Sequence, residues 1–216
     1  FRVRVAAIRQ LLHIPSEAKS AQSLLAEISE RVDQQQRFFG GVFFEEIIPA
    51  LKSEGIDLML SSELPLSCHA FVRNYFMREV LHQLQPILLV KSKVVPFLQN
   101  GALYLAVALV SRKSKVKDPS KRRLRYAMVQ IPGQLPRFLS IPGQEQRHLV
   151  LFIDDVIRNG LDQLFPGYEI VASHSFKLSR DADLRIEDEF TGNLIEKLRE
   201  SLIRRKTGAP SRFLYD

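Results

Sequence analysis

Cysteine and long apolar runs are both scarce in this chain. Cys68 is the single cysteine among 216 residues, which excludes an internal disulfide and fits a reducing compartment. The longest uncharged apolar run, residues 102–110, is far shorter than the roughly 20 residues that a membrane-spanning helix needs. The start of the chain does not resemble a signal peptide. We therefore expect no transmembrane segment and a location in the cytoplasm, with peripheral attachment to a membrane left open.

Glycine-rich phosphate loops and metal-ligand motifs are also missing. Neither the Walker pattern nor G-x-G-x-x-G occurs among the ten glycines, and the five histidines lack the spacing of a zinc site. Asp181 and Asp183 form a D-x-D pair that could hold magnesium, although we favour a structural role for both. We therefore assign no catalytic, nucleotide-binding or metal-binding residue, and the residues alone indicate no self-sufficient active site.

The positive charge of the chain is concentrated in one segment. The formal net charge of the chain is +7. Residues 111–125 contain eight basic residues and one acidic residue, Asp118, so the net charge of this segment equals that of the whole chain. An Asp-Pro-Ser sequence at 118–120 indicates a loop, so we interpret the segment as a solvated hairpin loop. The alternative is a polyanion site, because basic residues bind phosphates where several converge on one surface. Its candidate anion contacts are Lys121, Arg122 and Arg123.

Hydrophobic periodicity predicts a helical start to the chain. Apolar residues recur at helical spacing over residues 1–13 and 21–54, and Pro15 separates the two stretches. Two helices joined by a short turn are expected to pack antiparallel. A Gly-Gly pair and a proline weaken the second helix within residues 40–49, where we expect a bend. Because the first stretch opens in mid-pattern, we expect the true N-terminus to lie upstream of Phe1.

The remainder of the chain predicts a mixture of helices and strands. Strands and helices follow one another without a steady alternation, so we predict an α+β fold with a mainly antiparallel sheet and packed helices. We place a helical domain at residues 1–58 and an α+β head domain at 59–216. Ser67 and Asp154 are expected to cap helices. The expected helices cover residues 67–85, 154–164 and 187–204, and the expected strands cover 56–60, 104–110, 125–131, 148–152, 168–178 and 212–215.

Residues 168–178 form the clearest predicted strand. Mostly apolar residues at even positions, with His174 among them, alternate with polar residues at odd positions, and Val171 alone breaks the polar set. This alternation predicts one face on a core and the other toward water or a cleft. The strand leads to Arg180, which is followed by Asp181 and Asp183. We expect these charges to close a turn, and the alternative is that Arg180 contacts an anion.

Seven short motifs follow one another along the chain. They are FRVRV at 1–5, IPAL with EGI at 48–56, LPRF at 135–138, DDVI at 154–157, LFPGY at 164–168, SRDAD at 179–183 and GAP at 208–210. Each motif alone is weak. In this order the seven resemble the N-terminal helical domain and the head domain of bacterial polyphosphate kinase of the first family, and the resemblance covers essentially the whole chain.

The resemblance implies an enzyme that transfers the terminal phosphate of ATP reversibly to a growing polyphosphate chain, through a phosphohistidine and with Mg²⁺. In that family the catalytic residues lie in two C-terminal phospholipase-D-like domains, which would be missing here. We therefore carry no catalytic residue over and expect this chain alone to bind neither ATP nor Mg²⁺. It would be the first third of a homo-oligomeric enzyme, with its helical domain beside the nucleotide and its head domain at the dimer contacts and the tunnel.

One segment departs from the family pattern, because residues 111–125 are longer and more basic than the resemblance implies. This departure keeps a second hypothesis open, namely a free-standing module that binds a polyanion or a nucleic acid, or that dimerises. RNA recognition usually combines basic residues with aromatic ones, and Tyr126 is the one aromatic residue beside this segment. The nucleic-acid version is therefore disfavoured.

Overall fold

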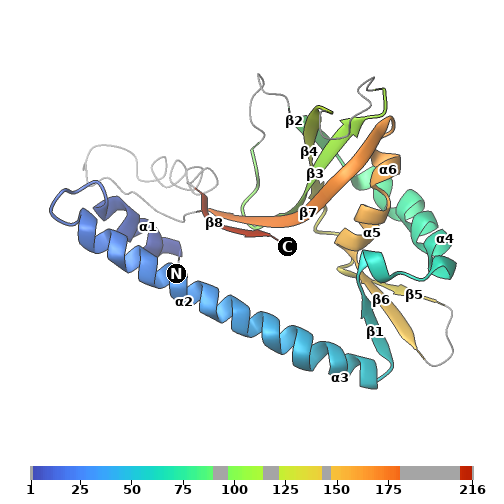
Figure 1. Cartoon of the computed structure of the whole chain (residues 1–216), viewed down its shortest axis with the longest axis horizontal. Helices are drawn as coiled ribbons and strands as arrows, with labels where there is room; N and C mark the ends of the chain where they lie inside the picture. The colour runs from blue at the N-terminus through green and yellow to red at the C-terminus, as the bar shows by residue number, and fades with distance from the viewer. Residues whose placement is uncertain (1, 90–96, 114–121, 143–146, 181–209, 216) are drawn as a thin grey trace, which may run out of the picture. The chain divides into compact units, whose positions relative to one another are not determined.

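A computed structural model describes residues 2–89, 97–113, 122–142, 147–180 and 210–215 (Figure 1). The predicted helix at 187–204 and the predicted turn at Asp181 and Asp183 lie outside the described residues. Contacts divide the chain into two compact units. The first unit comprises Phe1–Val42, Leu98–Gly101 and Lys177–Leu214, and the second comprises Phe43–Phe97, Ala102–Phe176 and Tyr215–Asp216. The predicted domain boundary between residues 58 and 59 stays a prediction.

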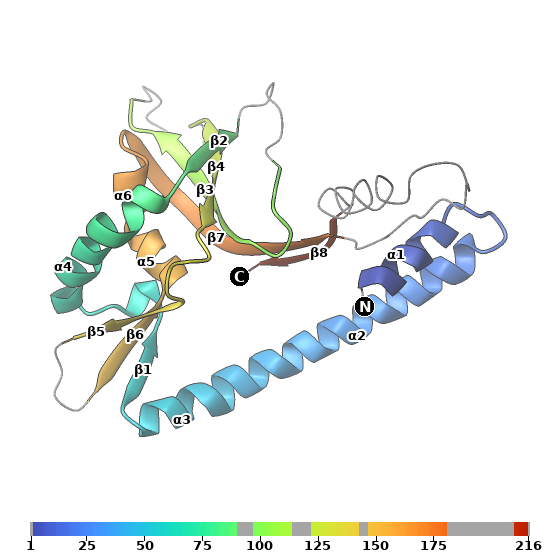
Figure 2. The same cartoon turned by 180° about the vertical axis from the view of Figure 1, so that it is seen from behind.

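The first unit contains the predicted pair of helices. Helix α1 (Arg2–Leu11) and helix α2 (Ala18–Gly41) are joined by a short turn, and α1 lies alongside the first turns of α2 (Figures 1 and 2). Small side chains make this close contact possible, since Ala6 and Ala21 are both buried. The predicted antiparallel helices at the start of the chain are therefore confirmed.

Helical structure continues beyond Gly41, through the stretch where the sequence predicts a bend. A π-helical segment η1 (Val42–Ile47) follows α2, and helix α3 (Ile48–Ser53) follows η1 with Pro49 in its first turn. Proline has no backbone N–H to donate within a helix, and a π-helical turn is one way to accommodate this local irregularity. Gly55 then ends the helix with a φ of 77°, a conformation that favours glycine.

Two groups of helical elements belong to the second unit. Around helix α4 (Leu66–Tyr75) lie the short segments η2 (Ser61–Glu63), η3 (Phe76–Val80) and η4 (Leu81–Gln83). Farther along the chain come helix α5 (Ile153–Asn159) and helix α6 (Leu161–Leu164). The predicted caps are wrong, because the N-cap positions are Pro65 and Phe152 and neither makes a side-chain cap. Ser67 and Asp154 lie inside the helices instead.

The strands of the described residues form two sheets. The smaller sheet has the order β1-β6-β5, in which β1 (Ile56–Met59) runs parallel and β5 (Phe138–Ile141) antiparallel to β6 (His148–Phe152). The larger sheet has the order β2-β4-β3-β7-β8, and both β2–β4 and β3–β4 are antiparallel. Its strands are β2 (Pro86–Leu89), β3 (Leu103–Ser111), β4 (Leu124–Ile131), β7 (Tyr168–Arg180) and β8 (Pro210–Tyr215). The predicted α+β fold with a mainly antiparallel sheet is confirmed.

The core of the second unit lies between the helices and one face of the larger sheet. Phe76 of η3 and Ile157 of α5 are fully buried with Leu105 and Leu109 of β3. Gly160, which links α5 to α6, approaches the ring of Phe76 so closely that an added methyl group would lie 2.5 Å from its ring carbons. A side chain at position 160 is therefore excluded by packing.

The predicted alternation of β7 holds only in part. Tyr168 and Ile170 pack against the core, as the even-numbered set should. Farther along, Phe176 stacks on Tyr104, with ring centroids 5.4 Å apart, while the odd-numbered Ser175 turns toward α5 and is buried. The residues of β7 that face the helices are thus even-numbered up to Ile170 and odd-numbered at Ser175. An extra residue in a strand, as in a β-bulge, has this effect.

We predict that Gly160→Ala lowers the free energy of unfolding by about 1 to 3 kcal/mol, because the methyl group must displace the ring of a fully buried phenylalanine. Urea denaturation of the purified chain measures this change. The matched control is Gly133→Ala, which adds the same methyl group where no atom lies within 4 Å. Equal stabilities for the two variants would contradict the packing argument.

Candidate functional site

The flanks of the basic hairpin loop bind the beginning of β7. The Arg112 Nε donates a hydrogen bond to the backbone carbonyl of Tyr168 at 3.0 Å, just beyond the end of β3. The Arg125 Nη1 donates to the Tyr168 hydroxyl at 3.0 Å, and the guanidinium carbon lies 5.7 Å from the centre of the ring. Such a position over an aromatic ring is a cation–π contact. Two of the eight basic residues therefore hold the hairpin against β7.

Of the four predicted anion contacts, the structure describes the side chains of Arg122 and Arg123. Arg122 forms an ion pair with Glu169 at 3.3 Å, with side chains 30% and 59% exposed. Arg123 is exposed, whereas Lys121 and the side chain of Arg180 lie outside the described residues. Partly exposed ion pairs stabilise a fold only weakly, so the pair with Glu169 does not by itself decide the role of Arg122. The role of these four residues as anion contacts stays a prediction.

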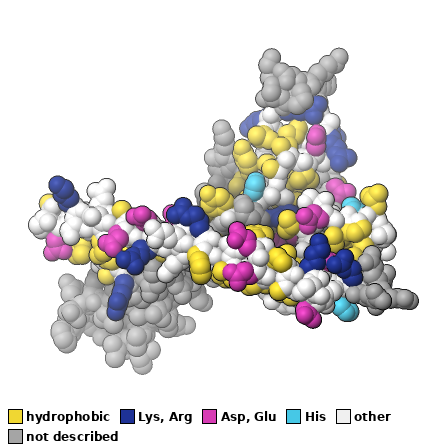
Figure 3. Space-filling model, turned by 60° about the horizontal axis from the view of Figure 1, so that its bottom comes forward, with side chains coloured by type: hydrophobic (Ala, Val, Ile, Leu, Met, Phe, Trp, Pro, Cys, Tyr) yellow, Lys and Arg dark blue, Asp and Glu magenta, His cyan; other side chains and the backbone are white. Residues whose placement is uncertain are grey.

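The hairpin itself agrees with the interpretation of residues 111–125 as a loop between two strands. β3 and β4 pair in antiparallel register from Leu103 opposite Ile131 to Val110 opposite Leu124. Figure 3 shows Lys and Arg side chains interspersed with Asp and Glu on the face that it draws, rather than gathered into one field.

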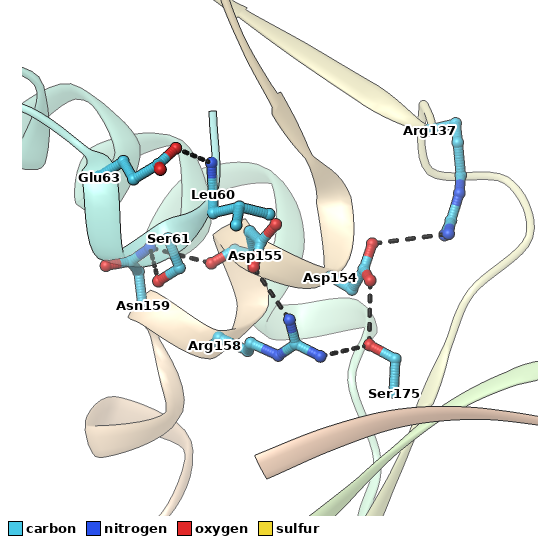
Figure 4. Close-up of polar contacts among 9 residues, drawn as sticks. All are labelled: Leu60, Ser61, Glu63, Arg137, Asp154, Asp155, Arg158, Asn159 and Ser175. Atoms are coloured by element: carbon cyan, nitrogen blue, oxygen red, sulfur yellow. Dashed lines mark hydrogen bonds and ion pairs between the residues drawn. The ribbon is translucent and has the colours of Figure 1, made fainter. Parts of the chain in front are cut away.

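A largely buried polar network joins α5 to β7 (Figure 4). The Ser175 hydroxyl donates to the Asp154 Oδ2 at 3.0 Å and accepts a hydrogen bond from the Arg158 Nη2 at 2.6 Å. Asp154 and Ser175 are 9% and 8% exposed. On its other side, the Asp154 Oδ1 faces the Arg137 Nη2 at 3.6 Å. One hydroxyl group thus connects a carboxylate to a guanidinium.

The same arginine pairs with a second carboxylate. The Arg158 Nη1 donates to the Asp155 Oδ1 at 3.0 Å, and the Asp155 side chain is 4% exposed. Burial raises the pKa of Asp155, although the neighbouring Arg158 charge and hydrogen bond oppose this rise. Asn159, one position further on, donates to the Ser61 hydroxyl at 2.8 Å and so connects α5 to η2.

An open hollow of about 430 Å³ lies beside this network. Its lining includes Asp155 and Arg158 from α5, Ser61 from η2, and Ser173 and His174 from β7. Arg158 is already bound to Asp155 and Ser175, so its charge is used within the fold. Among the described residues, no group of three or more His, Cys, Asp or Glu side chains could hold a metal ion. The arrangement binds α5 to β7.

Sequence reasoning did not find this network. The motif DDVI at 154–157 was interpreted as a cap, yet an aspartate and an arginine at positions 155 and 158 lie one helical turn apart and can pair. That spacing was a usable signal. No sequence pattern indicates the contacts of Ser175. Its side chain points toward α5 because the positions of β7 that face the helices change from even to odd along the strand.

Comparison with known proteins matches this architecture to one family. The family model described as the polyphosphate kinase middle domain matches residues 68–216. The polyphosphate kinase of Exiguobacterium sibiricum is 32% identical over 187 residues, which are 86% of this chain and 24% of that protein. The polyphosphate kinase of Mycolicibacterium gilvum is 30% identical over 98% of this chain and 29% of its own length. The chain belongs to the polyphosphate kinase family.

A solved polyphosphate kinase has the same fold. The crystal structure of the enzyme from Porphyromonas gingivalis aligns with 95% of this chain at a TM-score of 0.70 and 30% sequence identity, and the alignment covers 31% of that protein. The chain thus spans about a quarter to a third of the polyphosphate kinases that it matches. Within the described residues, we find no helix with the length and apolar character needed to traverse a bilayer.

We predict that Ser175→Ala destabilises the chain by about 1.5 to 3 kcal/mol, because a buried carboxylate and a partly buried guanidinium both lose a hydrogen-bond partner. Ser140→Ala is the control, since it removes a hydroxyl from an exposed strand position and should change stability by less than about 0.5 kcal/mol. Chemical denaturation of both variants tests this. Wild-type stability in Ser175→Ala would show that the network contributes nothing to the fold.

Proposed function

We propose that this chain is the part of an ATP–polyphosphate phosphotransferase that shapes the enzyme without performing phosphoryl transfer. The observation that carries the proposal is the match to polyphosphate kinases over almost the whole chain, in sequence and in fold. The polar groups support the same role, because Arg158 binds Asp155 and Ser175, and Ser175 in turn binds Asp154. Paired groups of this kind hold elements together.

The complete enzyme would make inorganic polyphosphate from ATP. We propose that ATP and Mg²⁺ bind with the help of further domains, and that a phosphohistidine of those domains carries the transferred phosphate. This chain would contribute a wall of the nucleotide pocket, part of the polyphosphate tunnel and contacts in a homo-oligomer. We place the enzyme in the cytoplasm, with peripheral attachment to a membrane as an additional possibility.

Polyphosphate would meet this chain at the basic loop. Arg123 is exposed, and Glu169, the ion-pair partner of Arg122, is exposed as well, so we propose that a phosphate chain can reach both arginines. We propose that Lys121 adds to the same contact and that Arg180 contributes at the end of β7. Tyr168, held by Arg112 and Arg125, would keep the base of the loop in place.

We predict that the chain alone makes no acid-insoluble polymer from labelled ATP and Mg²⁺. A chimera in which it replaces the matching segment of the Mycolicibacterium gilvum enzyme should make polyphosphate, because this segment of the enzyme would supply shape rather than reacting groups. The same enzyme with the segment deleted is the control and should be inactive. Synthesis by the chain alone, or an inactive chimera that is folded, would contradict the proposal.

We predict that neutralising Lys121, Arg122 and Arg123 to glutamine weakens polyphosphate binding and reduces its dependence on salt, because fewer counterions are released. Fluorescence titrations at several salt concentrations measure both effects. The control neutralises three exposed basic residues elsewhere, Lys52, Arg73 and Arg78, and should leave both nearly unchanged.

Polyphosphate titrations of Arg180→Ala, together with its melting temperature, distinguish the two roles considered for Arg180. Weaker binding at an unchanged melting temperature indicates an anion contact, whereas a lower melting temperature with unchanged binding indicates a structural turn. If the variant with glutamine at positions 121, 122 and 123 binds polyphosphate with wild-type affinity at low salt, the basic segment is only a solvated hairpin loop.

A further inference from the structure

A groove of about 340 Å³ lies between helix α4 and the junction of α5 with α6. Figures 1 and 2 show α4 beside α5, and contacts join the two helices. The walls of the groove carry polar side chains, which are His69 and Arg73 from α4 and Asn159, Asp162 and Gln163 from the other side. Sites for small molecules have volumes upward of roughly 300 Å³ and a few converging polar groups. The groove is therefore large enough to hold a small molecule.

The two walls carry opposite charges that are not paired. Arg73 lies on α4 and Asp162 on α6, and both residues are exposed. Among the described residues, no ion pair joins these two side chains to each other or to a third. Asp162 accepts one hydrogen bond, from the Gln163 Nε2 at 2.6 Å, and a carboxylate can accept several more. The guanidinium and the carboxylate are thus both available to a molecule in the groove.

Uncharged acceptors lie on the same two walls. The His69 Nε2 is 3.1 Å from the backbone oxygen of Leu64, which can only accept, so the neutral ring donates there and accepts at Nδ1. The Asn159 Nδ2 donates to the Ser61 hydroxyl and to the backbone oxygen of Asp155, which leaves the Asn159 Oδ1 as an acceptor. An ammonium group brings three N–H donors and no acceptor. Together with Asp162, the lining therefore suits an ammonium group.

Apolar side chains complete the lining. They are Leu64, Ala70 and Val72. Methylene groups that contact such side chains leave water, which favours binding. The lining therefore complements a short molecule with an ammonium group, an aliphatic middle and an anionic group for Arg73.

We propose that this groove binds a small zwitterion, namely an amino acid whose carboxylate contacts Arg73 and whose ammonium group contacts Asp162. We call the groove the α4–α6 groove. The inference goes beyond the proposed function and does not depend on it. Because both charged side chains are exposed to water, each ion pair contributes little, and we expect dissociation constants of about 1 to 10 mM.

NMR titration of the isotope-labelled chain tests this inference. The probes are glycine, 4-aminobutyrate and 6-aminohexanoate, which separate the two charges by different lengths. At least one of them should shift the resonances of α4 and of residues 159–163 in a saturable way. Butyrate and butylamine each carry one of the two charges and should bind about fivefold more weakly than the best zwitterion, because each forms only one ion pair.

Charge variants test the two contacts separately. Arg73→Gln and Asp162→Asn should each raise the half-saturating concentration of the best zwitterion about fivefold, since each removes one ion pair. Arg73→Asp should abolish saturable binding. Combining it with Asp162→Arg should restore binding, because the zwitterion can then lie in the opposite direction. Arg78→Gln is the control, with an exposed arginine that does not line the groove, and it should bind as the wild type does.

Three results would overturn the inference. The first is the absence of saturable shifts with all three zwitterions. The second is equal binding of butyrate and the best zwitterion, which would show only the attraction of an anion to a basic chain. The third is a charge-exchanged double variant that binds no better than Arg73→Asp alone. If a variant fails to fold, the comparison of butyrate and butylamine with the zwitterions on the wild type still decides the question.

Discussion

The pairing of buried charges between α5 and β7 is the constraint on which the second unit depends. A carboxylate or a guanidinium that leaves water must find partners, because an unpaired buried charge costs several kcal/mol. Asp155 and Arg158 pair with each other, and Ser175 of β7 supplies a hydrogen-bond partner to both Asp154 and Arg158. The helix is thereby tied to a strand of the larger sheet, and Asn159 ties the same helix to η2. This network also shapes one wall of the adjoining hollow.

Some of the basic residues of the hairpin have a structural role. Arg112 and Arg125 bind the backbone, the hydroxyl and the ring of Tyr168, so part of the positive charge holds β3 and β4 against β7. A guanidinium can fill such a role with several hydrogen bonds and a ring contact at once, which an ammonium cannot. A supporting role for this chain in a polyphosphate kinase is consistent with that use of arginine. Its polar groups bind one another, and its surface remains available for other parts of the enzyme.

Much of the fold could be predicted because it follows from local sequence. The strand at 148–152 was predicted with its correct bounds, and the two strands that flank the basic loop were predicted to within one residue at each end. Each has several apolar residues in a row between loop signals. The strands Pro86–Leu89 and Phe138–Ile141 were not predicted, since each has four residues beside prolines that indicate turns. The family, too, was predicted from the order of seven short motifs.

The sequence by itself determined the fold class, the antiparallel helical start and the hairpin, because hydrophobic periodicity and turn residues act over short distances along the chain. It also determined the family, because the order of the seven motifs can be read without knowing which residues are in contact. Only the tertiary structure decided what the side chains do. The sequence predicts Asp154 as a helix cap, whereas in the structure Asp154 accepts a hydrogen bond from Ser175. The sequence also predicts that even-numbered residues of β7 face the core throughout, whereas this holds for Tyr168 and Ile170 but not for Ser175. Residues 21 positions apart in the chain meet there through packing of a helix on a sheet, and no local pattern encodes that distance.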